Sequence, residues 1–271
     1  MINCIRRALM HHSIVDVDVN SAELLHLHRF SVQTKFLLRE AFNSFYLQIN
    51  DILIANRVEG ERVLELGSGA GFAAAVIPNL IASDIRFAPN LDLMGDACNF
   101  PVSTHSFGAV FAINVFHHIN SPELFLDECI RIVRPGGLVV LVEPHIGLLS
   151  SLFHRMIHTN EYFDETTVGW SNEAAHGPML GANQALAHNI FVRDNLIFNK
   201  KYDSRLFIDN SEYSSNTLTY LLSGGVNFIQ LAPDSTSAIL SSLSNFIFKN
   251  SLLSLHKFTI LRTTSNNRAD I

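Results

Sequence analysis

The strongest constraint on the fold is a series of five short, mostly apolar runs in the central part of the chain. They cover residues 62–66, 80–84, 91–96, 107–114 and 138–143. Short buried runs separated by helical stretches are typical of βαβ units, in which helices cover both faces of a parallel sheet. The sequence therefore predicts an α/β fold with the five runs as strands.

One of the intervening helices carries boundary signals. Ser121 can cap its N-terminus, and Pro122 suits the first helical position. Its buried stripe consists of Phe125, Cys129, Ile130 and Val133. Pro-Gly-Gly at 135–137 is predicted to stop this helix and turn the chain into the fifth strand.

The remaining chain is arranged around this block. Residues 1–57 predict an N-terminal helical segment, either packed on a sheet edge or forming a lid, because Leu37, Ala41, Phe45 and Ile49 recur at four-residue steps. The run 255–261 predicts an edge strand. The predicted divisions are a core at 58–144, an insertion at 145–200, a completion of the sheet at 201–262 and a frayed tail at 263–271.

Composition excludes some classes of protein. The net charge of −6 and the absence of Lys/Arg clusters argue against a nucleic-acid partner. Three cysteines without CxxC spacing favour reduced thiols in the cytoplasm. No run reaches the roughly 18 apolar residues of a membrane span, so we expect no transmembrane segment.

The most informative motif follows the first predicted strand. Residues 67–71 read Gly-Ser-Gly-Ala-Gly, a GxGxG loop. Glycines let the backbone turn tightly and let a ligand approach, and the following helix offers unpaired N–H groups. The spacing differs from the GxGxxG of dinucleotide binders. A glycine turn in an ordinary α/β fold is the alternative reading.

Polar side chains also end the later strands. Asp84 lies 19 residues after Glu65, where a carboxylate can accept hydrogen bonds from both ribose hydroxyls. Asp96 ends the third strand, where it can meet an adenine amino group, and residues 114–118 follow the fourth. Because ligands of open α/β sheets bind at the carboxyl ends of the strands, the sequence predicts a nucleoside site there.

Together these segments resemble class I S-adenosylmethionine-dependent methyltransferases. The similarity is carried by residues 64–71, 95–97, 115–119 and 126–144. Residues 176–186, 190–194 and 220–226 are also similar to a bacterial subgroup of methyltransferase-domain proteins with no assigned acceptor. The resemblance implies a Rossmann-like, mostly parallel seven-stranded sheet with helices on both faces, N-terminal helices and an insertion after strand five.

The resemblance also implies S-adenosylmethionine as the cofactor. Gly67, Ser68, Gly69 and Gly71 would surround its methionine part, with Glu65 orienting the amino group directly or through water. Asp84 would hold the ribose, and Asp96 with Ala97 the adenine. Asn114, Val115 and Phe116 would line the cofactor near the sulfonium, and His117 would pack beside it.

Two positions depart from the family pattern. The interval from Gly71 to Asp84 is short, so the first helix is expected to span about two turns and to end at Pro78. Gly108 stands where the family commonly has an Asp that braces the loop.

The sulfonium is a strong electrophile, so the protein mainly has to align donor and acceptor. A hydroxyl acceptor also needs a base, for which His is suited, whereas a carboxylate acceptor needs none. The candidate catalytic residues at the strand ends are His118, Glu143 and His145. The insertion would form most of the acceptor pocket, with Asn183, Gln184 and Arg193 as substrate-facing candidates. Arg193 with Asp194 could equally form a salt bridge that fixes the insertion.

His154 and His158 have the i, i+4 spacing of a metal-binding pair, but no Cys, Asp or Glu has companion spacing. The stretch predicts an amphipathic cap helix, and we expect no metal site.

The leading hypothesis is a methyltransferase acting on a small or carrier-linked metabolite, with glycan or lipid biosynthesis as possible contexts. The alternatives are a non-catalytic S-adenosylmethionine-binding regulatory or scaffolding protein, and an NAD-dependent oxidoreductase. The latter is disfavoured by the glycine spacing and by the lack of a Tyr-x-x-x-Lys pair. The oligomeric state and the acceptor atom are not indicated.

Overall fold

One seven-stranded sheet organises the part of the chain that the structure, a computed structural model, describes: residues 7, 9–14, 17–18, 21–69, 71–89, 91–156, 161–171 and 182–264. The strands are β1 (Val63–Leu66), β2 (Leu80–Asp84), β3 (Leu93–Met94), β4 (Phe107–Ile113), β5 (Val133–Pro144), β6 (Leu206–Tyr213) and β7 (His256–Thr263). Their order is β3-β2-β1-β4-β5-β7-β6. Only β7 runs antiparallel to its neighbours, β5 and β6. The expected mostly parallel, seven-stranded α/β fold is confirmed.

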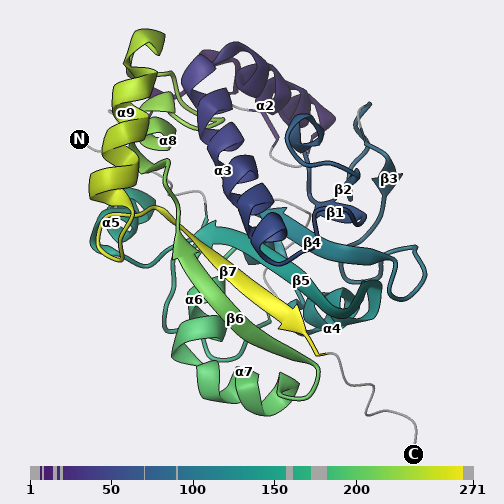
Figure 1. The fold of residues 1–271 in the computed structure, drawn as a ribbon. Helices are drawn as coiled ribbons and strands as arrows, with labels where there is room; N and C mark the ends of the chain where they lie inside the picture. The colour runs from purple at the N-terminus through teal and green to yellow at the C-terminus, as the bar shows by residue number, and fades with distance from the viewer. Residues whose placement is uncertain are drawn as a thin grey trace, which may run out of the picture.

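Helices cover both faces of this sheet (Figure 1). They are α2 (Ala22–Thr34), α3 (Phe36–Ala55), α4 (Pro122–Ile132), α5 (Leu148–Met156), α6 (Leu186–His188), α7 (Asn195–Tyr202), α8 (Thr217–Ser223) and α9 (Ser237–Leu243). Short 3-10 turns are η1 (His12–Ile14), η2 (Ala73–Ala75), η3 (Phe116–His118) and η5 (Asp234–Thr236), and π turns are η4 (Asn189–Arg193) and η6 (Ser244–Phe248).

Two apolar cores result, one on each face. Along β4, Ala109 and Phe111 pack towards α3, whereas Val110 and Ala112 pack towards α4, α6 and α7. This alternation follows from the two-residue period of a strand. Because both faces are covered, β1 and β4 are buried at every position.

The prediction that residues 255–261 form an edge strand is wrong about the position of the strand in the sheet. The strand forms as β7, but it lies inside the sheet between β5 and β6, and β6 is the edge. The physical reason is visible in the side chains. Six of the eight β7 residues are buried, whereas β6 contains the polar run 209–212 and is largely exposed.

Two predicted helix boundaries also differ. The helix expected to run about two turns after Gly71 is reduced to the single 3-10 turn η2. The helix α4 ends at Ile132, before Pro-Gly-Gly, which instead bulges within β5: Val133 pairs with Phe107 and Leu138 already with Ala109. At its start, Pro122 occupies the first turn as expected, but the Ser121 side chain makes no capping hydrogen bond.

Gly108, where the family commonly has an Asp, makes room for another carboxylate. A Cβ at Gly108 would lie 2.6 Å from the Cβ of Glu61, so the Glu61 side chain covers this position. Glu61 forms an ion pair with Arg134 at the start of β5. The pair links the loop before β1 to β5 across β4.

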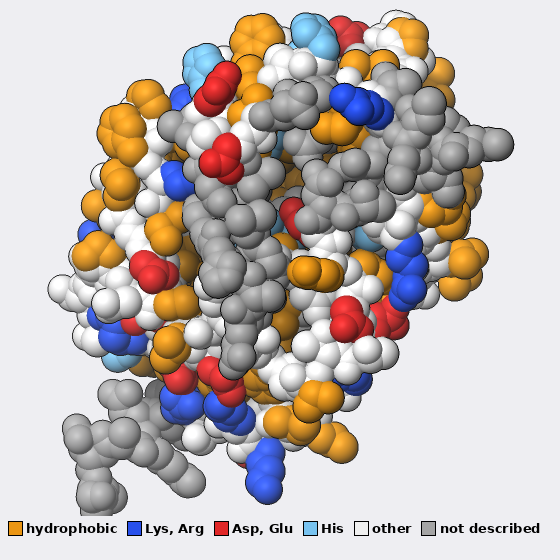
Figure 2. Space-filling view, turned by 180° about the vertical axis from the view of Figure 1, so that it is seen from behind, with side chains coloured by type: hydrophobic (Ala, Val, Ile, Leu, Met, Phe, Trp, Pro, Cys, Tyr) orange, Lys and Arg blue, Asp and Glu red, His pale blue; other side chains and the backbone are white. Residues whose placement is uncertain are grey.

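The surface is mixed in charge. On the face shown in Figure 2, Lys and Arg side chains of the described residues are interspersed with Asp and Glu and form no continuous patch. No helix among the described residues is long and apolar enough to cross a membrane. Of the tail predicted for 263–271, Thr263 belongs to β7, and residues from 265 lie outside the described part of the chain.

Candidate functional site

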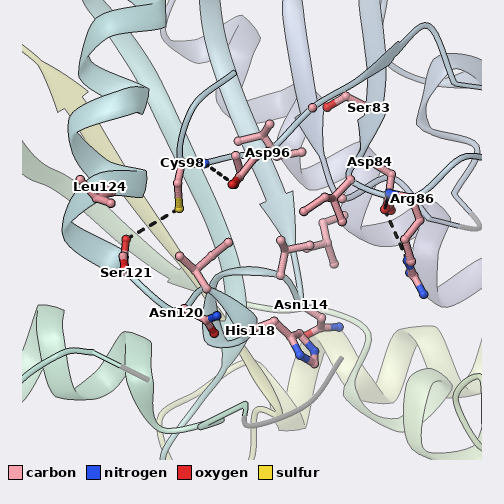
Figure 3. Close-up of a pocket in the computed structure, with 18 residues that line it drawn as sticks. Ser83, Asp84, Arg86, Asp96, Cys98, Asn114, His118, Asn120, Ser121 and Leu124 are labelled. Carbon is pink, nitrogen blue, oxygen red and sulfur yellow. Dashed lines mark hydrogen bonds and ion pairs between the residues drawn. The ribbon is translucent and has the colours of Figure 1, made fainter. Parts of the chain in front are cut away.

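A cavity of about 550 Å³ lies at the carboxyl ends of β1, β2 and β4 (Figure 3), and we call it the strand-end cavity. Predicted site residues that line it are Gly67, Asp84, Asp96, Ala97, Asn114, Val115 and His118. They come from four separate segments, which the parallel sheet brings to one edge. Cys98, Ser121 and Leu124 also line this cavity.

Two carboxylates in this cavity have different surroundings. Asp84 is buried; its Oδ2 accepts a hydrogen bond from the Gly69 N–H (3.0 Å) and its Oδ1 from the Arg86 N–H (2.9 Å). Asp96 is exposed, and its Oδ1 accepts a hydrogen bond from the Cys98 N–H (2.8 Å). Asp84 thus ties the glycine loop to the end of β2.

The glycine loop is packed too closely for other residues. Gly67 has a φ of +71°, and a Cβ there would lie 2.4 Å from the Cγ2 of Val115. A Cβ at Gly71 would lie 2.5 Å from the Tyr46 hydroxyl of α3. Both the backbone conformation and the close contacts therefore require glycine at position 67.

Glu65 lies behind this loop. Its side chain is buried, it lines neither this cavity nor the pocket described next, and the Ser68 Oγ donates a hydrogen bond to its Oε2 (2.7 Å). Burial raises the pKa of the Glu65 carboxyl to about 7, the Ser68 hydrogen bond opposes this, and nearby Asp84 adds to it. Ser68 therefore links the Glu65 carboxyl to the glycine loop.

A second cavity of about 190 Å³, which we call the histidine pocket, adjoins the first. It is lined by imidazoles of His28, His117, His118, His154 and His256, and by apolar side chains of α2, α3 and α5. The two cavities share Gly67, Arg86, Ile113, Asn114 and His118. A ligand atom beside Asn114 or His118 could therefore be reached from both the strand-end cavity and the histidine pocket.

Glu143, at the end of β5, fixes the turn that carries these histidines. Its buried Oε1 accepts hydrogen bonds from the N–H groups of Val115 (3.0 Å) and Phe116 (2.8 Å), and its Oε2 lies 2.5 Å from the His117 Nδ1. On the other side of the ring, Nε2 lies 3.5 Å from the Glu161 Oε2. Burial lowers the pKa of His117, but Glu143 and Glu161 more than offset this and raise it.

Of the remaining predicted residues, His145 and Phe116 line neither cavity, whereas His117 lines one of them. The His145 Nε2 lies 3.0 Å from the Ser251 carbonyl oxygen, and the ring lines neither cavity. Phe116 is wholly buried in the apolar core, so it lies beneath the site. His117 lines the histidine pocket.

The insertion residues have mainly structural contacts. The Asn183 side chain exchanges hydrogen bonds with the backbone of Asp164, and the Gln184 Nε2 donates to the Glu161 Oε2 (2.5 Å). Arg193 pairs with both oxygens of Asp194, which also accepts a hydrogen bond from the Trp170 indole. The salt-bridge alternative for Arg193 is the one the structure shows. Of these residues, only Gln184 lines the histidine pocket.

Glu161 is the site residue that the sequence did not reveal. It lies 3.7 Å from the His118 Nε2 (atom Oε1) and 3.5 Å from the His117 Nε2, although 43 residues separate it from His118. The surrounding sequence has no helical or strand period, so no local signal marks it.

The sequence also offered His154 and His158 as a pair with metal-ligand spacing. His158 lies outside the described residues, and His154 lines the histidine pocket.

Comparison with known proteins relates residues 64–141 to the family described as "Methyltransferase domain". A protein of Mycolicibacterium smegmatis named "Probable S-adenosylmethionine-dependent methyltransferase" is 29% identical over 106 residues, which are 34% of this chain and 41% of that protein. Demethylmenaquinone methyltransferase of Renibacterium salmoninarum is 30% identical over 138 residues, 45% of this chain and 56% of that protein. The chain thus spans about half the length of these relatives.

Among solved structures, an S-adenosylmethionine-dependent methyltransferase from Thermotoga maritima matches 88% of this chain and 99% of its own, with a TM-score of 0.49 and 15% identity.

Replacing Glu65 by Gln should change how stability depends on pH. The unfolded chain releases the Glu65 proton near its ordinary pKa of 4.5, whereas the folded protein keeps it up to about 7. The carboxyl therefore contributes stability below pH 4.5 that is lost as the pH rises through 7. Glu65→Gln removes this loss, so at alkaline pH it should unfold with a free energy higher by up to about 3 kcal/mol.

Thermal unfolding of both proteins between about pH 5 and pH 8.5 measures the effect. The exposed Glu59→Gln is the matched control and should follow the original protein at every pH. Parallel curves for Glu65→Gln and the original protein would show that burial does not hold the proton.

Proposed function

We propose that this chain, whose residues 64–141 belong to the class I S-adenosylmethionine-dependent methyltransferases, transfers a methyl group from that cofactor to a small or carrier-linked metabolite. The observation that carries the proposal is the strand-end cavity. The glycine loop and the polar ends of β2 and β4 converge on it within the segment that matches the family.

The cavity suggests an orientation for the cofactor. Adenine would lie against Asp96 and Ala97, and the ribose hydroxyls would reach Asp84. The methionine part would follow the loop from Gly67 to Gly71 towards the histidine pocket, with Glu65 reached through Ser68. In this orientation the sulfonium would lie near Asn114, where the two cavities meet.

The histidine pocket would hold the acceptor. Transfer forms a bond between the acceptor atom and the methyl carbon, breaks the carbon–sulfur bond and leaves S-adenosylhomocysteine. Alignment of the two reacting atoms is the main contribution of the protein. For a hydroxyl acceptor, His118 is the proposed proton acceptor because it lines both cavities. We assign Glu143 a positioning role, since both of its oxygens already bind the turn.

The pocket walls favour an apolar acceptor. Leu25, Val32, Phe42 and Phe153 contribute hydrocarbon surface. Polar contacts come from the imidazoles and from the side chains of Arg86, Glu161, Gln184 and Asn227. Apolar walls with a few convergent polar groups suit a ring or a lipid-linked group better than a sugar. A relative named for demethylmenaquinone is consistent with this class.

Cofactor binding can be tested by calorimetric titration with S-adenosylhomocysteine. We expect micromolar binding, no binding of NAD, and a loss of about tenfold or more in Asp84→Ala, equivalent to about 1.4 kcal/mol. Asp84 also holds the Gly69 N–H, so Asp96→Asn, on an exposed side chain, serves as a second variant. The exposed Asp51→Ala on α3 is the control. A preference for NAD, or equal binding by all variants, would remove the methyltransferase assignment.

The acceptor pocket can be tested by filling it. Val32 is buried on α2 and lines the histidine pocket, whereas Gln33 beside it is exposed. With radiolabelled S-adenosylmethionine and a panel of phenols, quinols and lipid extracts, the original protein and Gln33→Trp should transfer label. Val32→Trp should bind S-adenosylhomocysteine normally but lose about tenfold or more of the transfer, because alignment is lost. Undiminished transfer by a cofactor-binding Val32→Trp would place the acceptor elsewhere.

A further inference from the structure

We infer that His117, His118 and Glu161 form a binding site for a divalent first-row transition-metal ion. The ligand atoms of these three side chains all lie within 4.8 Å of one another. Two imidazoles and one carboxylate are a ligand set typical of such ions, with Zn²⁺ as the reference case. The inference does not depend on the proposed methyl transfer.

The separations approach those of a bound ion. Around a tetrahedral ion with bonds of about 2.0–2.2 Å, neighbouring ligand atoms lie about 3.3–3.6 Å apart. The Glu161 Oε2 lies 3.5 Å from the His117 Nε2, and the other carboxylate oxygen, Oε1, lies 3.7 Å from the His118 Nε2. The two imidazole nitrogens, within 4.8 Å, need to approach each other by no more than about 1.5 Å.

Second contacts hold two of these ligands in place. Glu143 binds the His117 Nδ1, which directs Nε2 of the same ring towards Glu161. A carboxylate behind a ligating histidine is the usual way to set its tautomer and orientation. The Gln184 Nε2 donates to Glu161, and the Asn183 N–H donates to the His117 carbonyl oxygen, so the insertion is anchored to the turn η3.

Charge also favours a cation here. Glu143 is almost wholly buried, and the Glu161 side chain is only 12% exposed. Buried carboxylates are stable when they are paired or bind metal ions. A divalent ion would balance both charges while the imidazoles remain neutral, which is the form that ligates metals.

The place of the site suggests what the ion would bind. His118 lines both cavities (Figure 3). Glu161 and His117 line the histidine pocket. Three protein ligands leave a fourth position for water or a substrate oxygen, as in catalytic zinc sites. An oxygen-bearing ligand in the histidine pocket could occupy that position. His118 would then be a metal ligand, with the oxygen activated by the ion instead of by the imidazole.

Metal content of the full chain tests the inference. The protein, freed of any histidine tag, is equilibrated with Zn²⁺, desalted and analysed by mass spectrometry for metals. We expect about one Zn²⁺ per chain, and a Co²⁺ derivative with the visible absorption of a tetrahedral site. Glu161→Gln and His118→Asn should each lose the bound ion. The exposed His105→Asn is the matched control, because Asn tolerates the positive φ of His105.

A further variant separates this site from random binding to histidines. Glu143→Gln should weaken Zn²⁺ binding by about 10- to 100-fold, since Glu143 orients His117 and the turn without binding the ion itself. No retained metal, or equal metal in the Glu161→Gln, His118→Asn and control proteins at unchanged thermal stability without metal, would overturn the inference. Metal retention by a protein that fails to bind S-adenosylhomocysteine would leave the metal site intact and remove the proposed function instead.

Discussion

The geometry of the site depends on the buried carboxylate of Glu143. A charge in this position must be met by hydrogen-bond donors, and the turn after β4 supplies them from Val115, Phe116 and His117. These contacts decide how the chain leaves β4. Asn114 takes a positive φ of 54° just before the turn, a conformation that Asn tolerates better than most residues. The turn therefore presents Asn114 and His118 to the cavity while Phe116 remains in the core.

The same turn also shapes the glycine loop. Val115 packs so closely on Gly67 that no side chain fits there, and Asp84 binds the next glycine, Gly69, from the neighbouring strand. Three strand ends are thus coupled by short contacts, with α3 behind them through Tyr46 and Gly71. Rigid coupling of this kind suits a reaction that depends on alignment, because small displacements of the reacting atoms reduce the rate strongly.

The sequence predicted those features that depend on local pattern. Most of the buried strands, the glycine loop and the polar strand ends leave signals within a few residues, and the structure has them at the expected positions. The run 91–96 is the exception, because it forms only the two-residue, exposed strand β3. Features set by distant partners were missed or misplaced. The order of β6 and β7 depends on which strand is covered on both faces. Glu161 reaches η3 through long-range contacts such as the pairing of Tyr162 with Asn183. The burial of Glu143 beneath three donors is likewise a product of the assembled sheet.

The two roles proposed for His118, which lines both cavities, are incompatible with each other. As a proton acceptor, its imidazole must be able to change protonation during each reaction. As a metal ligand, it must remain neutral and bound throughout. The carboxylate of Glu161, 3.7 Å away, stabilises an imidazolium in the first case and shares the ion in the second. Because Glu161 belongs to the insertion and His118 to the core, either role makes the chemistry depend on how the insertion docks. Asn183, Gln184 and Arg193, considered from the sequence as substrate contacts, then serve this docking through their hydrogen bonds within the insertion and to η3.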